Sequence, residues 1–196
     1  MKFIMEWMLK LNTCGSYETI RLVALTLEQD KDFVPFTRNA LDLIKRADSR
    51  RYRRMLGEIR YIVNSHIQSA GAYQRATRRI SVNFSLYKAD PTDSTYDLHL
   101  ALYAAMLVHE VTHARLFSHG IPYNDHTWKR CESICLLEVR RFLFRVKPDN
   151  YDLTQMPDHV DLKYYRAIRG VSALQKLKST FEFLSQVFPK KNTRNY

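Results

Sequence analysis

The chain has 196 residues, of which 45% are hydrophobic and 26% are charged, and its formal net charge is +11. This composition is typical of a globular protein with a packed core, and it excludes a disordered tail or a collagen-like repeat. The length predicts a single domain over residues 1–196. The longest apolar run, Leu100–Val108, has nine residues. Because that is too short to cross a bilayer, we expect no membrane span.

Two features of the sequence bear on its compartment. The apolar N-terminal segment is interrupted by Glu6 and Lys10 and no charged region precedes it, so we expect no secretory signal. The three cysteines, Cys14, Cys131 and Cys135, are an odd number without zinc-ribbon spacing. They favour a reducing, cytoplasmic setting.

The N-terminal half predicts two helices followed by two strands. Apolar residues recur at helical spacing over 16–29, with Ser16 as the N-cap, and over 36–47. β-Branched and aromatic residues dominate 58–64, which predicts a strand. Apolar and polar residues alternate over 80–86, so we expect a second strand with one buried face, antiparallel to the first.

The second half predicts helices. Ser94 and Asp97 have the spacing of a capping box at the start of a long helix, and Gly120 with Pro122 ends it. The apolar run on this helix leaves no polar face there, so that part should be buried all round.

Further helices follow along the chain. One covers about 126–147, with Asn124 or Asp125 as its cap, and two helical patterns occupy 160–187. Together these elements predict an α+β domain, mostly helical, with a small antiparallel sheet.

The long helix carries His109-Glu110-Val111-Thr112-His113. Residues four apart on a helix lie about 40° from each other around its axis, so the two imidazoles face one point and can hold two corners of a zinc tetrahedron. Glu110 lies about 100° round from His109, where its carboxylate can accept a proton from a water molecule that the metal activates. The alternative is a pair of histidines with ordinary hydrogen bonds. Their position next to a buried apolar run favours the metal, because unpaired polar rings are costly there.

Several residues are candidates for the third ligand. Glu132 lies on a stripe of the 126–147 helix that is otherwise apolar or thiol, and a buried carboxylate needs a partner, either zinc or an arginine. Glu138, at the edge of the stripe, could instead orient one of the histidines. The stripe consists of Trp128, Glu132, Cys135, Val139, Phe142 and Val146.

Other candidates fit less well. His119 has the histidine spacing of the metzincins, but those have a glycine where this chain has Leu116. Because the helix continues to Gly120, His119 should lie about 15 Å along the axis from His109 and out of reach. Asp125 and His126, at the entrance of the next helix, are weaker candidates.

Eighteen residues separate His113 from Glu132, giving HExxH-x18-E. This pattern resembles the gluzincin metallopeptidases, the thermolysin and zinc-aminopeptidase type. The segments LVHEVTHARLFSHGIPY and RCESICLLEVRRF also resemble a group of small, uncharacterised bacterial metallopeptidase-like proteins, over about residues 58–145. The resemblance implies a zincin-like fold in which His109, His113 and Glu132 bind Zn²⁺ and Glu110 is the general base.

The resemblance leaves two parts of the site open. Gluzincins often carry an aspartate four residues after the ligand glutamate, where this chain has Leu136, so the surroundings of the ligands must be built differently. In the large enzymes of this type a tyrosine or histidine stabilises the transition state, and no single residue of this chain can be matched to it. The candidates are Tyr73, Tyr123, His126 and His159.

We therefore expect a zinc metallopeptidase that hydrolyses peptide or protein substrates. In zincins an edge strand above the metal pairs with extended substrate; we expect the strand 80–86 to fill this role. The preceding residues 72–79 would form either a basic rim that favours acidic substrates or a solvated strand end. The basic residues of this rim are Arg75, Arg78 and Arg79.

The alternative is a basic module that binds nucleic acid or protein, with a structural or vestigial metal site. The basic stretch Lys45–Arg60 supports it, but no helix-turn-helix, zinc finger or aromatic RNA-binding pattern accompanies the stretch. An arginine-rich helical face is also compatible with simple solvation. The arginines concerned are Arg50, Arg51, Arg53 and Arg54.

Overall fold

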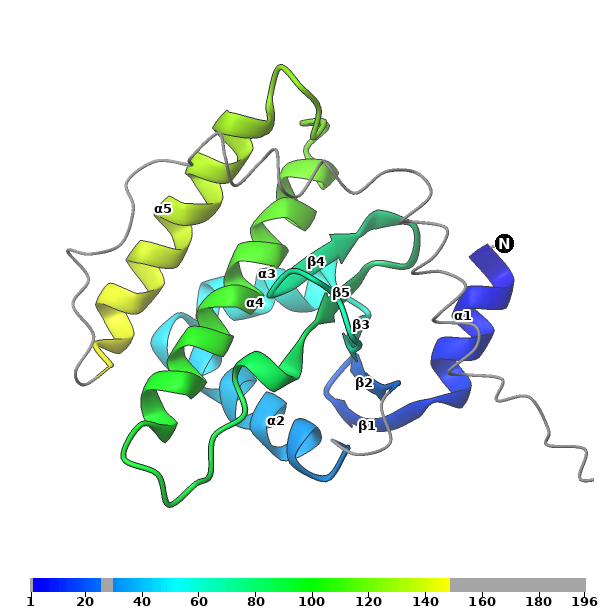
Figure 1. The fold of residues 1–196 in the computed structure, drawn as a ribbon. Helices are drawn as coiled ribbons and strands as arrows, with labels where there is room; N and C mark the ends of the chain where they lie inside the picture. Colours follow the sequence, from blue (N-terminus) through cyan, green and yellow to red (C-terminus); the bar gives the residue numbers. More distant parts are fainter. Residues whose placement is uncertain (1, 26–29, 149–196) are drawn as a thin grey trace, which may run out of the picture. The chain divides into compact units, whose positions relative to one another are not determined.

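In the computed structural model, the described residues form a mixed sheet of five strands with helices on both faces (Figure 1). The structure describes residues 2–25 and 30–148, and all of them belong to one compact unit. The helices predicted over 160–187 lie outside the described residues. Within the described ranges, no helix is long and apolar enough to cross a membrane. Within the described ranges, Cys14, Cys131 and Cys135 form no disulfide.

The α+β character predicted from the sequence is confirmed. The helices are α1 (Lys2–Leu11), α2 (Asp30–Ala47), α3 (Ser49–Glu58), α4 (Tyr96–Ser118) and α5 (Trp128–Val146). The strands are β1 (Thr13–Tyr17), β2 (Ile20–Ala24), β3 (Tyr61–Asn64), β4 (Gly71–Gln74) and β5 (Arg79–Val82). Short 3₁₀ turns occupy Arg75–Thr77 and Phe84–Leu86.

The prediction of an antiparallel sheet is wrong, because the sheet is mixed. The strand order is β1-β2-β3-β5-β4, in which β2, β3 and β5 run parallel and the two edge strands run antiparallel to their neighbours. The segment between β3 and β5 holds a strand of its own, β4, which pairs antiparallel with β5. For this reason β3 and β5 meet in parallel.

The predicted helix over 16–29 is also wrong, since β1 and β2 form a hairpin there. Ile20 and Leu22 face the main core, whereas Val23 packs on the opposite face of the sheet. A strand buried on both faces has a nearly continuous apolar sequence, and its pattern cannot be told from that of a buried helix.

Two other expected strands are shorter than predicted. Residue Glu58 ends α3, so β3 begins only at Tyr61. β5 ends at Val82, and the chain then turns through Phe84–Leu86. The turn carries the Phe84 ring into a buried cluster with Phe33, Phe36 and Tyr103, which outweighs continuation of the strand.

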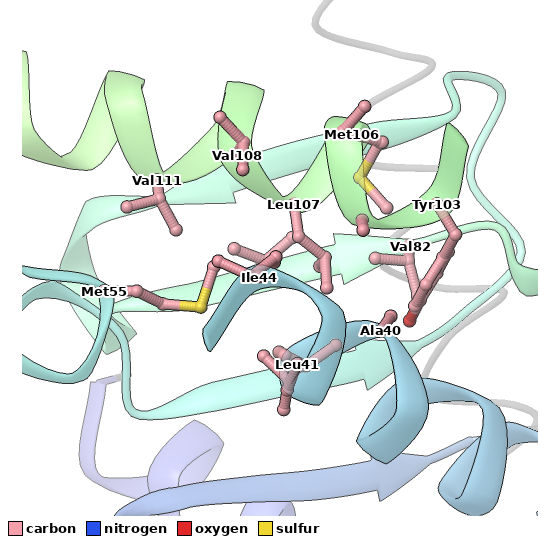
Figure 2. Packing of buried hydrophobic residues seen from close by; sticks show 14 of the residues in the cluster. Ala40, Leu41, Ile44, Met55, Val82, Tyr103, Met106, Leu107, Val108 and Val111 are labelled. Carbon is pink, nitrogen blue, oxygen red and sulfur yellow. The ribbon is translucent and has the colours of Figure 1, made fainter. Parts of the chain in front are cut away.

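The main core lies between one face of the sheet and the helices α2, α3 and α4, with α5 packed along α4 (Figures 1 and 2). On α4, the apolar run is buried as predicted, apart from the half-buried Leu102. α1 covers the other face of the sheet, where Leu9 meets Val23, Tyr61 and Val63.

The ends of the α4–α5 hairpin position the site. Thr95, rather than a Ser94 capping box, occupies the N-cap of α4. Gly120 has a φ of 77° and ends α4 as predicted, because the amides of Gly120 and Ile121 donate to the carbonyls of Phe117 and Leu116 in a Schellman motif. The chain then reverses direction into α5, whose N-cap is Thr127 rather than Asn124 or Asp125.

Candidate metal centre

The side chains of the HExxH motif meet two side chains of α5 where the two helices pack together. His109 and His113 lie one turn apart on α4, and Glu132 and Cys135 lie one turn apart on α5. The reversal at Gly120 brings α5 alongside α4 (Figure 1). The pairing of α4 with α5 therefore decides which polar groups converge.

Two imidazole nitrogens and one carboxylate converge on a point. His109 Nε2 lies 3.1 Å from His113 Nε2 and 3.2 Å from Glu132 Oε2, and His113 Nε2 lies 3.3 Å from Glu132 Oε1. Donors bound tetrahedrally to zinc with bonds of 2.0–2.1 Å are separated by about 3.3 Å. The separations of these donor atoms therefore fit a single zinc ion.

Cys135 is a further candidate ligand that sequence reasoning did not propose. Its Sγ and one nitrogen from each of His109 and His113 all lie within 4.8 Å of one another. The Cys135 side chain is fully buried, whereas the Glu132 side chain is 17% exposed. The available signal was its position on the same helical stripe, one turn after Glu132. The described residues thus contain a candidate metal site of two histidines and a thiol, flanked by a carboxylate.

The electrostatics of the site follow from its burial and its charges. Burial alone would lower the pKa of His109, but the hydrogen bond to Glu132 and the charges of Glu110 and Glu132 outweigh burial and raise it. Burial would raise the pKa of Glu132, but its hydrogen bonds to His109 and His113 hold it well below its ordinary value. Burial and the nearby carboxylates raise the pKa of Cys135. These interactions thus favour the ionised form of Glu132 and the protonated form of His109, relative to the isolated side chains.

Glu110 lies against the edge strand of the sheet. Its side chain is 6% exposed, and a Cβ atom built on Gly71 of β4 would lie 3.2 Å from Glu110 Cγ. In the described part of the chain, no hydrogen bond or ion pair joins its carboxylate to another residue. A nearly buried carboxylate of this kind is available to a water molecule or a ligand.

Tyr123 joins the site from the loop between α4 and α5. Its hydroxyl donates to Glu132 Oε1 over 2.6 Å, and its ring lies edge-on to the His113 ring at 5.3 Å. Of the other residues considered for transition-state stabilisation, Tyr73 packs against the main core and His126 is exposed. His159 lies outside the described residues.

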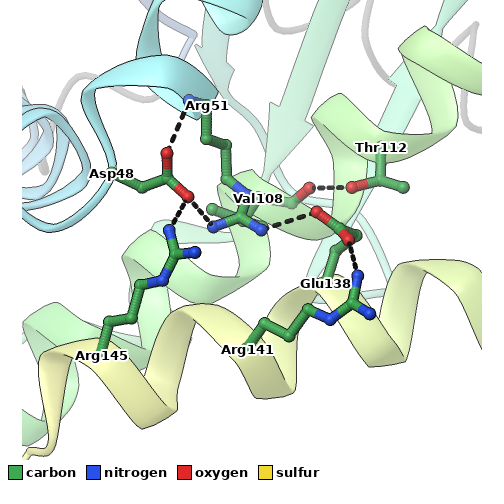
Figure 3. Close-up of polar contacts among 7 residues, drawn as sticks. All are labelled: Asp48, Arg51, Val108, Thr112, Glu138, Arg141 and Arg145. Atoms are coloured by element: carbon green, nitrogen blue, oxygen red, sulfur yellow. Dashed lines mark hydrogen bonds and ion pairs between the residues drawn. The ribbon is translucent and has the colours of Figure 1, made fainter.

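The expectation that Glu138 orients one of the histidines is wrong, because Glu138 is bound to arginines instead. Its carboxylate accepts from Arg51 of α3 over 2.6 Å and from Arg141 over 2.9 Å (Figure 3). Arg51 also pairs with Asp48, which pairs with Arg145 in turn. Glu138 therefore joins α5 to the start of α3, in a network separate from the histidines.

His119 lies away from His109 and His113, as expected from its place at the end of the helix. His119 is the C-cap residue of α4, and its Nδ1 lies 2.8 Å from the carbonyl oxygen of Arg115. Asp125 and His126 are exposed at the entrance of α5. The structure does not gather these side chains around His109 and His113.

The edge strand beside the site is β4 rather than the expected strand 80–86, because β5 pairs on both sides. Of the expected rim, only Arg75 faces α4, with its guanidinium 4.8 Å from the centre of the Phe117 ring. Arg78 donates to the carbonyl oxygen of Glu58, and Arg79 is buried with Nη1 against Met5 of α1. The basic rim is therefore much smaller than predicted.

Comparison of the chain with protein-family models, with curated proteins and with solved structures finds no match.

Proposed function

We propose that this protein is a zinc-dependent peptidase in which His109, His113 and Glu132 hold the metal. The observation that carries the proposal is the convergence of two Nε2 atoms and one carboxylate with separations of 3.1–3.3 Å. Two histidines and a glutamate are a ligand set of catalytic zinc, which keeps a fourth position for water or substrate.

The remaining residues have roles that follow from their positions. Zinc bound in this site would polarise the carbonyl of a peptide bond and acidify a water molecule. Glu110, nearly buried and next to His109 on α4, would accept a proton from the attacking water and pass it to the leaving amine. The Tyr123 hydroxyl would hold the Glu132 carboxylate in its orientation through their 2.6 Å hydrogen bond.

The edge strand β4 supports a peptide as substrate. β4 is the last strand of the sheet and pairs with β5 along one edge. An extended peptide can add to the other edge by main-chain hydrogen bonds. Gly71 brings the β4 backbone close to Glu110, so a peptide added there would lie near the base. Arg75, just after β4, would favour an acidic side chain in that peptide.

The test is to measure bound zinc and peptide hydrolysis in three variants of the full chain. Glu110→Gln should retain zinc and lose hydrolysis, because it removes the base and no ligand. His113→Ala should lose both. His119→Ala, on the same helix but outside the donor set, should keep both and serves as the matched control. A wild-type protein that folds in the presence of zinc without binding it would overturn the proposal, as would undiminished hydrolysis by Glu110→Gln.

A second candidate function is a structural metal site, favoured by the buried thiol of Cys135. If the thiolate fills the fourth position, the site is closed and holds α4 to α5 without catalysis. Cys135→Ala separates the two functions, with Cys131→Ala, the other buried cysteine of α5, as control. A structural site should lose metal and stability in Cys135→Ala, whereas a catalytic site should retain zinc and hydrolysis.

Nucleic-acid binding is the remaining alternative, and its support is the exposed arginines of α3. Arg50, Arg53 and Arg54 are exposed, whereas Arg51 is engaged with Asp48 and Glu138. If these side chains contact phosphates, neutralising the three should weaken binding to DNA or RNA and reduce the slope of its salt dependence by about 0.9 per lost contact on duplex. Unchanged binding in the triple variant would exclude this function for α3.

A further inference from the structure

The helix α1 presents an apolar stripe to solvent. Phe3, Ile4, Trp7 and Leu11 are 81%, 61%, 53% and 63% exposed, and they make up half of the exposed large hydrophobic residues in the described ranges. Their spacing places them on one side of the helix, opposite Leu9, which packs on the sheet. A contiguous exposed patch of this kind marks an interaction surface.

A basic pocket lies beside this helix, with a volume of about 430 Å³. Its charged lining consists of four basic side chains and one carboxylate, namely Lys10, Arg21, Arg60, Arg78 and Glu6. One of these groups is engaged, since Arg78 Nε donates to the carbonyl oxygen of Glu58. Among the described residues, no ion pair neutralises Lys10, Arg21 or Arg60. The pocket therefore offers uncompensated positive charge to an anion.

The stripe and the pocket share an edge. Around the axis of α1, Lys10 lies about 20° from Phe3 and about 60° from Trp7. Lys10 and Glu6 belong to the lining of the pocket, so the apolar stripe ends where the basic lining begins. A single partner seated over this edge would contact both features.

We propose that α1 and the basic pocket bind the surface of an anionic phospholipid bilayer. An amphipathic helix can lie in the membrane plane with its apolar side in the boundary between headgroups and acyl chains, where tryptophan and phenylalanine are favoured. The stripe provides that side, and the adjacent cations meet the phosphates of anionic lipids. A partner protein or a second copy would need an acidic surface next to an apolar groove, whereas a bilayer presents both chemistries over its whole surface.

The test is co-sedimentation of the full chain with phosphatidylcholine vesicles, with and without phosphatidylserine. The protein should bind vesicles that contain phosphatidylserine and release them at high salt, because the cation–headgroup attraction is screened. Trp7→Glu should abolish binding without unfolding the protein, since this side chain is more than half exposed. Circular dichroism and thermal denaturation report the fold.

Charge variants test the pocket separately from the stripe. Arg21→Gln with Arg60→Gln should lower vesicle binding roughly thirtyfold, about fivefold for each charge removed near the surface. The matched control removes two exposed charges from α5 in Lys129→Gln with Arg130→Gln, which should change binding by about twofold at most. α5 packs along α4, on the opposite side of the sheet from α1.

Three results would overturn the proposal. The first is no binding to vesicles that contain phosphatidylserine. The second is binding of inorganic phosphate in the pocket, lost in Arg21→Gln with Arg60→Gln, without vesicle binding. The third is a dimer in sedimentation equilibrium that Trp7→Glu dissociates, which would assign the stripe to a second copy.

Discussion

Among single residues, Tyr123 connects the candidate metal centre to the loop before α5. It is 38% exposed, and its hydroxyl is hydrogen-bonded to the carboxylate that faces both histidines. Groups that orient a ligand affect metal affinity without touching the metal. The proposed zinc site therefore depends on Tyr123 even though no motif includes it.

We expect Tyr123→Phe to lower zinc affinity roughly tenfold, because Glu132 loses the hydrogen bond that orients it. Competition with a chromophoric chelator measures the affinity. Tyr96→Phe is the matched control. Tyr96 lies at the start of α4, away from the histidines, and its hydroxyl accepts a hydrogen bond from Asn39 of α2. Equal zinc affinity in wild type and Tyr123→Phe would contradict the role of the hydroxyl.

At the scale of elements, the contact of β4 with α4 requires a glycine. A Cβ atom at Gly71 would clash with Met106 Sδ and press on Glu110 Cγ. The two side chains lie one turn apart on α4, so a displaced β4 would move Glu110 together with Met106 of the core.

Gly71→Ala should therefore lower the free energy of unfolding by about 1–3 kcal/mol, through overpacking. Chemical denaturation measures the loss. Gly57→Ala is the control, because no atom lies within 4 Å of its Cβ position and alanine favours a helix. This second change should raise stability by about 0.5–1 kcal/mol. Equal changes in the free energy of unfolding of the two variants would show that the close approach at Gly71 does not affect stability.

A second contact between elements is the ion-pair network of Figure 3. Arg51 of α3 lies between Asp48 and Glu138, and these three side chains are 11–18% exposed. Asp48 also accepts from the backbone amide of Arg51 and caps α3. The network thus fixes the start of α3 against α5.

Arg51→Ala should lower the free energy of unfolding by about 3 kcal/mol at neutral pH, because it leaves two partly buried carboxylates without their shared partner. Arg53→Ala, exposed on the same helix, should change it by less than about 0.5 kcal/mol. Zinc content should stay the same in both variants, since neither residue contacts the histidines. A small effect of Arg51→Ala would show that the network adds little to stability.

The same network predicts a dependence of stability on pH. Burial alone would raise the pKa values of Asp48 and Glu138, but hydrogen bonds and charges from the arginines outweigh it and lower both. Their contribution to stability is complete above the unfolded pKa values of about 4 and is lost as the pH falls through the lower folded values. Denaturation midpoints measured from neutral to acidic pH should fall less steeply for Glu138→Gln than for wild type. Parallel curves would contradict the assignment.

For the molecule as a whole, a metal held between α4 and α5 would stabilise the folded state. Zinc at one hundred times its Kd should raise the free energy of unfolding by about 2.7 kcal/mol if the unfolded chain does not bind it. Thermal denaturation with zinc and with a chelator measures this gain. The wild-type midpoint should rise with zinc, and that of His113→Ala should not. An unchanged wild-type midpoint would contradict a zinc site in the folded protein.

The chain has a net charge of +11, and its described basic residues lie in different surroundings. Arg51 is engaged in ion pairs, and Arg79 is buried against α1. Arg21 and Arg60 line the pocket beside α1. The basic residues thus include ion-paired, buried and pocket-lining side chains. The net charge of the sequence does not distinguish these three environments.

The sequence by itself determined the features that lie within one helix. The HExxH spacing, the burial of Leu100–Val108 and the end of α4 at Gly120 depend on helical periodicity and local capping, and each can be recognised over a few turns. The stripe that carries Glu132 and Cys135 on α5 is of the same kind.

Only the tertiary structure decided which elements meet. The parallel register of β3 with β5, the place of β4 at the edge, the pairing of Glu138 with Arg51, and the approach of Tyr123 and Cys135 to the histidines all join segments far apart in the chain or on different elements. A short apolar run is compatible with a buried strand or a buried helix, as at β2. Pairing between elements depends on packing across the whole core, which local periodicity does not encode.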